Sequence, residues 1–238
     1  NDLIDLLLNC NNVCMRIVEL VNCDTESVQM PALRTLGNIA TGSDEATQAV
    51  VDCGAPSILK RLLQHPKRST KKEATWALSN IMAGTRAQIE ATMRVGIMPE
   101  LVRMLQNEEY NIKKEVTWTI CNATSGGTPA HIGTIVHTSG CLDALGDMLD
   151  CHDVKIVEVV LEALENILKS GVTTGGDYAE LLEAAGILDN LEELQEHENA
   201  TIYERALKIL DKYFNTETVQ DITIQPVHFT FEGFTCTN

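Results

Sequence analysis

The sequence predicts an all-α solenoid, that is, a row of stacked helical repeats, and three observations support this fold class. Only 4% of the 238 residues are aromatic, which argues against an aromatic-rich sandwich or barrel. The segments GNIATG at 37–42, SNIMAG at 79–84 and CNATSG at 121–126 follow one another at intervals of 42 residues. Between them, leucines and methionines recur at helical spacing and need a neighbouring unit to cover them.

The repeat at 42–84 divides into three predicted helices. Residues 45–52 predict a short first helix, 56–64 a second and 69–83 a third. Gly54 follows the first helix and Gly84 the third, where we expect a left-handed residue to end each of them.

Two further features recur with the repeat. Pro56 and Pro99 fall in the first turn of second helices, and Pro31 near the start of a third. A glycine series advances by 42, 44 and 46 residues, and its members are Gly54, Gly96, Gly140 and Gly186.

A period near 42 is typical of armadillo and HEAT repeats, which span about 40 to 47 residues. One short and two longer helices per unit favour the armadillo plan, so we predict a right-handed superhelical armadillo solenoid. We expect a glycine-rich loop at 171–177 before the last unit. The predicted organisation is a partial repeat 1–41, repeats at about 42–84, 85–126, 127–171 and 172–214, and a flexible tail at 215–238.

Charge excludes several classes of partner. Eighteen Lys and Arg against 34 Asp and Glu give a formal charge of −16 at pH 7, which repels phosphate backbones and makes nucleic acid an unexpected ligand. No apolar run reaches the length of a membrane span. The segment from Asp143 to Glu198 contains fifteen acidic residues and only two lysines. This excess of charge fits either a solvated surface or a surface that binds a partner.

The eight cysteines contain no CxxC pair and fall mostly in apolar helical stretches, which favours a reducing compartment. Cys141, Cys151 and His152 match no zinc spacing, so we expect no metal and no cofactor. The histidines are scattered, and no GxSxG, HExxH or phosphate-binding glycine loop occurs, so we expect no enzyme. Because Asn1 falls within an apolar pattern, we expect a piece of a longer chain.

Two tryptophans occupy identical repeat positions. Trp76 and Asn80 stand four residues apart, as do Trp118 and Asn122, so each pair shares one helical face. A single buried tryptophan is more often part of a core. Two of them, each beside a polar amide, favour a ladder that faces a ligand.

The chemistry of the ladder suits an extended, lysine-rich peptide along the inner surface. An Asn carboxamide donates to and accepts from a peptide backbone, and an indole face attracts an ammonium group with about 0.5 to 2 kcal/mol. We expect Asp44 and Glu115 to complete the coordination of the ammonium. Thr41 and Thr47 are expected to add acceptors near Asn80.

The segments KEATWALSN at 72–80, NATSGG at 122–127 and LENIL at 164–168 resemble the importin-alpha family, adaptors that carry nuclear localisation signals. The resemblance covers residues 13–214 and suggests the end of the fifth repeat through the tenth. It implies that the minor signal-binding site is formed by Arg34, Asn38, Thr41, Asp44, Thr47, Trp76, Ser79, Asn80, Glu115, Trp118 and Asn122.

Two departures limit the predicted ladder. Arg34 stands where the repeat pattern expects tryptophan, which interrupts the row, and Glu162 replaces tryptophan in the unit after Trp118. Although Asn166 persists there, we expect the ladder to stop.

The resemblance also implies partners and location. Basic localisation signals and their cargo are expected on the ladder, and the export receptor, nucleoporins and folded cargo on the acidic C-terminal repeats. The major signal site and the segment that recruits importin-beta are expected to lie outside this sequence. The implied location is cytoplasmic and nuclear.

The alternative is an armadillo scaffold for another protein partner, as in catenin-like adaptors. Such a groove needs rows of Lys and Arg to hold an acidic partner. Only Arg34, Lys72 and Lys114 are near the predicted ladder. A partner at the acidic C-terminal surface is the other form of this alternative.

Overall fold

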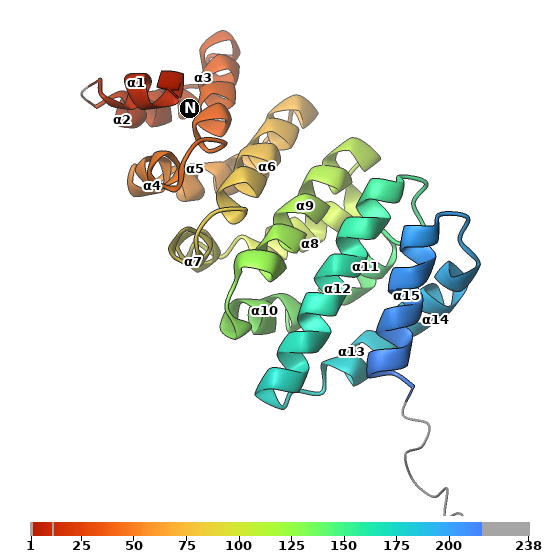
Figure 1. Cartoon of the computed structure of the whole chain (residues 1–238). Coiled ribbons are helices and arrows are strands. Elements are labelled where there is room, and N and C mark those ends of the chain that lie inside the picture. The colour runs from red at the N-terminus through yellow and green to blue at the C-terminus, as the bar shows by residue number, and fades with distance from the viewer. Residues whose placement is uncertain (1, 11, 216–238) are drawn as a thin grey trace, which may run out of the picture.

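The computed structural model describes residues 2–10 and 12–215, and throughout this part the chain is helical without a strand. The helices follow one another as a solenoid, which confirms the predicted fold class (Figure 1). The expected tail falls, from residue 216 on, outside the described residues.

The chain opens with α1 (Asp2–Leu8), α2 (Val13–Val21) and α3 (Glu26–Ile39). Each later unit has two short helices and one long one. In chain order these are α4 (Asp44–Asp52), α5 (Ala55–Leu62) and α6 (Arg68–Met82); α7 (Arg86–Arg94), α8 (Met98–Asn107) and α9 (Tyr110–Gly126); α10 (Pro129–Val136), α11 (Cys141–Gly146) and α12 (Val154–Thr174); and α13 (Tyr178–Ala184), α14 (Ile187–Glu193), the 3₁₀ turn η1 (Leu194–Glu196) and α15 (Ala200–Tyr213).

The long helices α3, α6, α9, α12 and α15 lie side by side, each packed against the next, and the short helices α8, α11 and α14 lie behind them (Figure 1). One continuous cluster of buried apolar residues runs through the stack from Ile17 to Leu210. Because no unit covers its own apolar face, the helices are held in position by their neighbours.

The three helices predicted in the second unit are confirmed to within two residues, but the expectation of two longer helices per unit is wrong. The second helix is as short as the first: α4 has nine residues and α5 has eight. In α5 the cause is local, because Pro66 follows and disfavours helical backbone at the residue before it. Only the third helix of each unit is long.

The expected left-handed conformation holds for Gly54 (φ 81°) but not for Gly84. The remaining members of the same series, Gly96, Gly140 and Gly186, are left-handed as well. Gly84 is required for another reason. A Cβ at this position would lie 2.0 Å from Oε1 of Gln88, which accepts a hydrogen bond from the N–H of Thr85 in the capping box of α7.

Two more expectations need correction. Pro31 lies inside α3 rather than near its start, because the helix begins a full turn earlier at Glu26. The expected loop at 171–177 is largely helical, since α12 continues to Thr174 and ends at the left-handed Gly175. Gly171 is inside this helix, where a Cβ would approach the Tyr178 Cβ to 2.9 Å. Its role is therefore close packing against Tyr178.

The same kind of close approach joins α3 and α6. A Cβ at Gly37 would lie 2.3 Å from Cζ3 of Trp76, so the indole lies directly against the backbone of the preceding long helix. No side chain fits between them without moving the ring.

Gly37→Ala is therefore expected to displace the Trp76 ring and to lower the free energy of unfolding by about 1 to 3 kcal/mol, as overpacking does. Denaturant unfolding and near-ultraviolet circular dichroism measure both effects. Gly133→Ala in α10 is the matched control, since its nearest neighbour is the Tyr178 hydroxyl at 3.3 Å, and it should be neutral or stabilising. Equal behaviour of the two variants would contradict the packing described here.

Candidate functional site

The structure brings the predicted indole and amide residues onto three neighbouring long helices. Both tryptophans are partly exposed rather than enclosed in the core. We call these residues the ladder, and the two residues at this position on each long helix a rung. The ladder consists of Arg34 and Asn38 on α3, Trp76 and Asn80 on α6, and Trp118 and Asn122 on α9.

The two central amides make the same hydrogen bond one repeat apart. Nδ2 of Asn80 donates to the Gly37 carbonyl at 3.1 Å, and Nδ2 of Asn122 donates to the Ser79 carbonyl at 3.0 Å. Each bond fixes the carboxamide relative to the preceding helix. One N–H and the carbonyl oxygen of each amide remain available for a ligand.

The rung on α12 is built differently. Asn166 donates to the Ser125 hydroxyl at 3.3 Å instead of to a backbone carbonyl. Glu162, in the place of the tryptophan, is exposed and lies 3.8 Å from Arg205 of α15. The indole and amide pair is thus present on α6 and α9, whereas α12 keeps the amide and has Glu162 in place of the indole.

Arg34 does more than interrupt the tryptophan row. Its guanidinium carbon lies 5.0 Å from the centre of the Trp76 ring, and its Nη1 donates to Oε1 of Glu73. The chain itself therefore places a cation on this indole, between the ring and a carboxylate.

Glu73 is the ladder neighbour that sequence reasoning missed. Its side chain is only 17% exposed, and its second oxygen, Oε2, is buried without a hydrogen-bond partner. The signal was present, because the recurring KKE segment makes Glu73 the repeat equivalent of Glu115. A buried carboxylate oxygen without a donor favours a cationic ligand.

Glu115 lies one turn before Trp118 and is half-buried. Burial raises the pKa of its carboxyl above the ordinary value of 4.5, while the positive charges of Lys72 and Lys114 oppose this shift and the charge of Glu73 adds to it. The net shift is upward, so the nearby lysines do not fully compensate the buried charge. A further cation would stabilise the ionised form.

Two of the predicted neighbours point inward. The Thr47 hydroxyl is buried and donates to the Ala40 carbonyl at 3.3 Å, and the buried Ser79 hydroxyl donates to the Trp76 carbonyl at 2.8 Å. The Thr47 bond joins α4 to the end of α3, whereas the Ser79 bond is internal to α6.

The other two neighbours are exposed. Thr41 follows the end of α3, and Asp44 is the first residue of α4. Their positions at the junction between two units leave Asp44 free to meet a ligand at the edge of the ladder.

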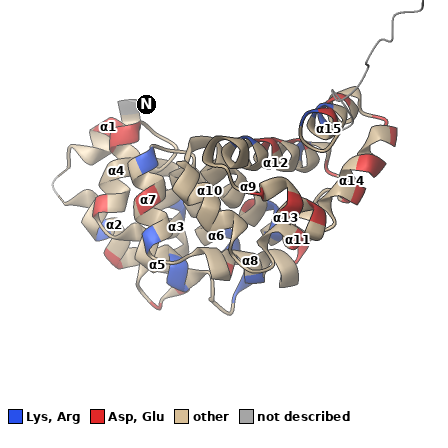
Figure 2. Ribbon diagram, turned by 90° about the horizontal axis from the view of Figure 1, so that it is seen from below, with Lys and Arg blue, Asp and Glu red and all other residues tan. Residues whose placement is uncertain are grey.

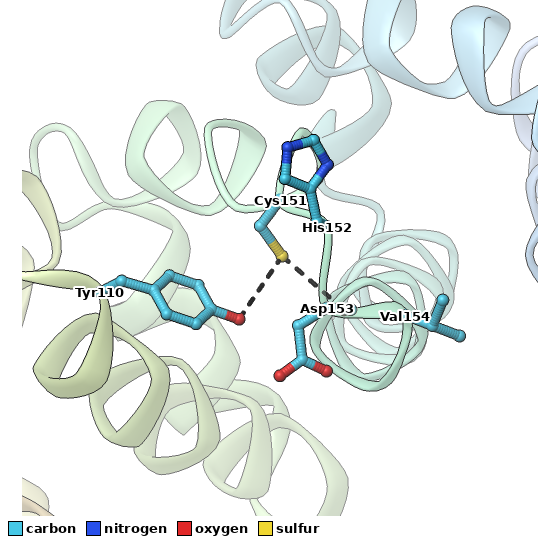
Figure 3. Close-up of a pocket in the computed structure, with 5 residues that line it drawn as sticks. All are labelled: Tyr110, Cys151, His152, Asp153 and Val154. Carbon is cyan, nitrogen blue, oxygen red and sulfur yellow. Dashed lines mark hydrogen bonds between the residues drawn. The ribbon is translucent and has the colours of Figure 1, made fainter.

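A cavity of about 660 Å³ lies away from the ladder, where α9 and α12 begin (Figure 3). The Tyr110 hydroxyl points at the Cys151 thiol at 4.0 Å, and that thiol donates to the Asp153 carbonyl at 3.7 Å. Cys141 is fully buried, and among the residues that the structure describes no three potential ligands gather around a metal position.

Acidic residues gather on α14 (Figure 2), and Glu196 of the following η1 adds to them. Four of them line one concavity, namely Asp189, Glu192, Glu193 and Glu196. None of the helices in the described ranges has the length and hydropathy needed to cross a membrane.

Comparison with known proteins identifies the repeats. The family described as armadillo/beta-catenin-like repeat matches residues 43–83 and 85–125, and the family described as atypical Arm repeat matches residues 176–226. A designed armadillo repeat protein, solved in complex with the peptide (KR)4, superimposes with a TM-score of 0.80 at 30% identity, over 89% of this chain and 85% of its own.

Importin-alpha subunits of plants share the sequence over most of its length. Importin subunit alpha-1b of Oryza sativa is 47% identical over 91% of this chain, and importin subunit alpha-7 of Arabidopsis thaliana is 51% identical over 87%. In both comparisons the match spans 42% of the relative, so this chain covers about two fifths of their length. Both groups of relatives are non-enzymatic, which confirms the prediction that the chain is not an enzyme. The chain therefore belongs to the armadillo-repeat family, and over the part that it shares with them it is a homologue of the importin-alpha subunits.

Proposed function

We propose that this chain is part of a nuclear import adaptor and binds Lys- and Arg-rich nuclear localisation signals in extended form along the ladder. The observation that carries the proposal is the repeated rung, in which an indole and an anchored amide recur on α6 and α9 with carboxylates one turn away.

The amides suit an extended backbone. Neighbouring long helices lie about 8 to 10 Å apart, and an extended peptide rises about 3.3 Å per residue, so a rung meets the peptide about every two to three residues. The free N–H and carbonyl oxygen of Asn80 and Asn122 pair with the peptide backbone whatever its side chains.

The indoles and carboxylates suit cations. A Lys or Arg stem packs on Trp76 or Trp118 while its charged end approaches the carboxylate of Glu73 or Glu115. At Trp76 the ligand competes with Arg34 for the ring and for Glu73. The charge of −16 attracts a basic peptide from a distance.

The relatives support the same class of ligand. The names of the homologues describe importin subunits, and the designed structural neighbour holds an alternating Lys-Arg peptide. By this homology the protein works in both cytoplasm and nucleus. The export receptor, nucleoporins and folded cargo are proposed partners of the acidic C-terminal helices, and importin-beta of a segment outside this sequence.

The second candidate is a scaffold that binds a protein partner outside the ladder. The acidic concavity on α14 and η1 favours it, because a basic surface of a partner complements four carboxylates. Binding of an acidic tail in the groove, as in catenin-like adaptors, is disfavoured because the carboxylates of Glu73 and Glu115 lie beside the ladder.

Trp76→Ala combined with Trp118→Ala should weaken a labelled Lys-Lys-Arg-type peptide by roughly 1 to 4 kcal/mol, since each ring contributes about 0.5 to 2 kcal/mol. Fluorescence anisotropy measures the affinity, and circular dichroism establishes that the variant is folded. Glu193→Ala on α14 is the control and should leave binding nearly unchanged. Full affinity in the folded double variant would refute binding on the ladder.

Peptide affinity should also fall on acidification from about pH 7.5 to about pH 5, because the raised pKa of Glu115 lets this carboxyl take up a proton at a higher pH than an ordinary glutamate. The neutral carboxyl no longer attracts the cation. Glu115→Gln should bind more weakly at pH 7.5 and show a flatter pH profile. A histidine-free peptide and the Glu193→Gln variant serve as controls, and an unaltered pH profile in Glu115→Gln would remove Glu115 from the site.

A further inference from the structure

A small cavity of about 270 Å³ continues the ladder beyond Trp118. Residues of α7, α9, α10 and α12 line it, and one of them is Asn166, the amide of the next rung. Its other polar lining residues are Arg86, Thr124, Lys169, Ser170 and Thr173. None of the described residues that line it is acidic, in contrast to the surroundings of Trp76 and Trp118.

Two cations in this cavity have no counter-ion among the residues that the structure describes. Arg86 is the first residue of α7, and Lys169 lies in the second half of α12; both are exposed. Across the part of the chain that the structure describes, neither has a carboxylate within the 4.0 Å of an ion pair. In a chain of charge −16, two such cations on one cavity form a local positive spot.

Ser170 supplies an independent sign of a missing acceptor. The residue is 6% exposed, and its hydroxyl oxygen is buried without a hydrogen-bond partner. Leaving such a group unsatisfied costs about 1 to 3 kcal/mol. The hydroxyls of Thr124 and Thr173 already donate to backbone carbonyls, each at 2.8 Å, so Ser170 is the hydroxyl donor that a ligand would satisfy.

The first residue of the first helix changes its charge from one unit to the next. Ser43 caps α4 and Thr85 caps α7, and the residues that follow them, Asp44 and Arg86, are the first residues of their helices. At the same place in two successive units the chain thus presents first an anion and then a cation. A ligand that spans both units meets opposite charges at the two junctions.

We infer that this cavity is a subsite for an oxyanion carried by the bound peptide, a phosphorylated side chain or a carboxylate next to the basic segment. The inference rests on the proposed function. Arg86 and Lys169 provide charge-assisted donors, and Ser170, which lines the same cavity, donates its hydroxyl once its side chain turns toward the oxyanion. A phosphoryl group carries more charge and more acceptor oxygens than a carboxylate, so it binds more tightly here.

The test compares otherwise identical basic peptides that carry Ser, Asp or phosphoserine beside the basic segment, placed at either end in two series. Anisotropy with the whole chain measures each affinity. In one of the series, phosphoserine should bind about tenfold more tightly than Ser, with Asp in between. The sign is diagnostic, because the net charge of −16 alone would weaken the binding of a phosphorylated peptide.

Arg86→Gln with Lys169→Gln should abolish the preference for phosphoserine while the Ser peptide keeps its affinity. Ser170→Ala should reduce the preference by about two- to fivefold. Arg16→Gln with Lys155→Gln removes two exposed cations elsewhere and should retain the preference.

Weaker or equal binding of the phosphorylated peptide in both series, or a preference that survives in the Arg86 and Lys169 variant, would overturn the subsite and leave the proposed function intact. Failure of the unmodified Ser peptide to bind the wild-type chain would overturn the proposed function and the subsite with it.

Discussion

The side-by-side packing of α3, α6 and α9 is the constraint on which the ladder depends, and the contact of the Trp76 ring with Gly37 is part of it. A stack of repeats transmits position from one unit to the next only through such neighbour contacts. The hydrogen bonds of Asn80 and Asn122 to the preceding helix repeat the same offset. Indoles and amides are thereby preorganised in a row before a ligand arrives, which lowers the ordering that binding requires.

The charged residues beside this row differ from one end to the other. Buried or half-buried carboxylates, Glu73 and Glu115, accompany the two indoles, whereas Arg86 and Lys169 line the cavity beyond them. Arg34 stacks on the Trp76 ring in the free chain, so a cation of the proposed ligand would have to displace this internal cation at that rung. On the proposed function, the surface would select a ligand with an ordered arrangement of charges rather than positive charge alone.

Periodicity predicted the elements, because a solenoid repeats the local sequence signals that start and end helices. The 42-residue spacing located the third helices and placed Trp76 and Trp118 on one face. What the pattern did not contain were contacts between units. The stacking of Arg34 on Trp76 and the unpartnered oxygen of Glu73 depend on how neighbouring helices approach. The hydroxyls of Thr47 and Ser79 instead bond to carbonyls seven and three residues earlier in the chain, which the repeat pattern does not reveal either. Gly84 shows the same limit, since its role comes from Gln88 and not from its own backbone angle.

The most direct test uses the fact that the chain has only two tryptophans. In a nitrogen-15 labelled sample, each indole N–H gives a resolved signal that is assigned with single Trp→Phe variants. During titration with a Lys- and Arg-rich peptide, both signals should shift along one shared binding curve. A peptide that binds while both indole signals stay in place, with the shifts confined to the acidic helices α13 and α14, would contradict binding on the ladder.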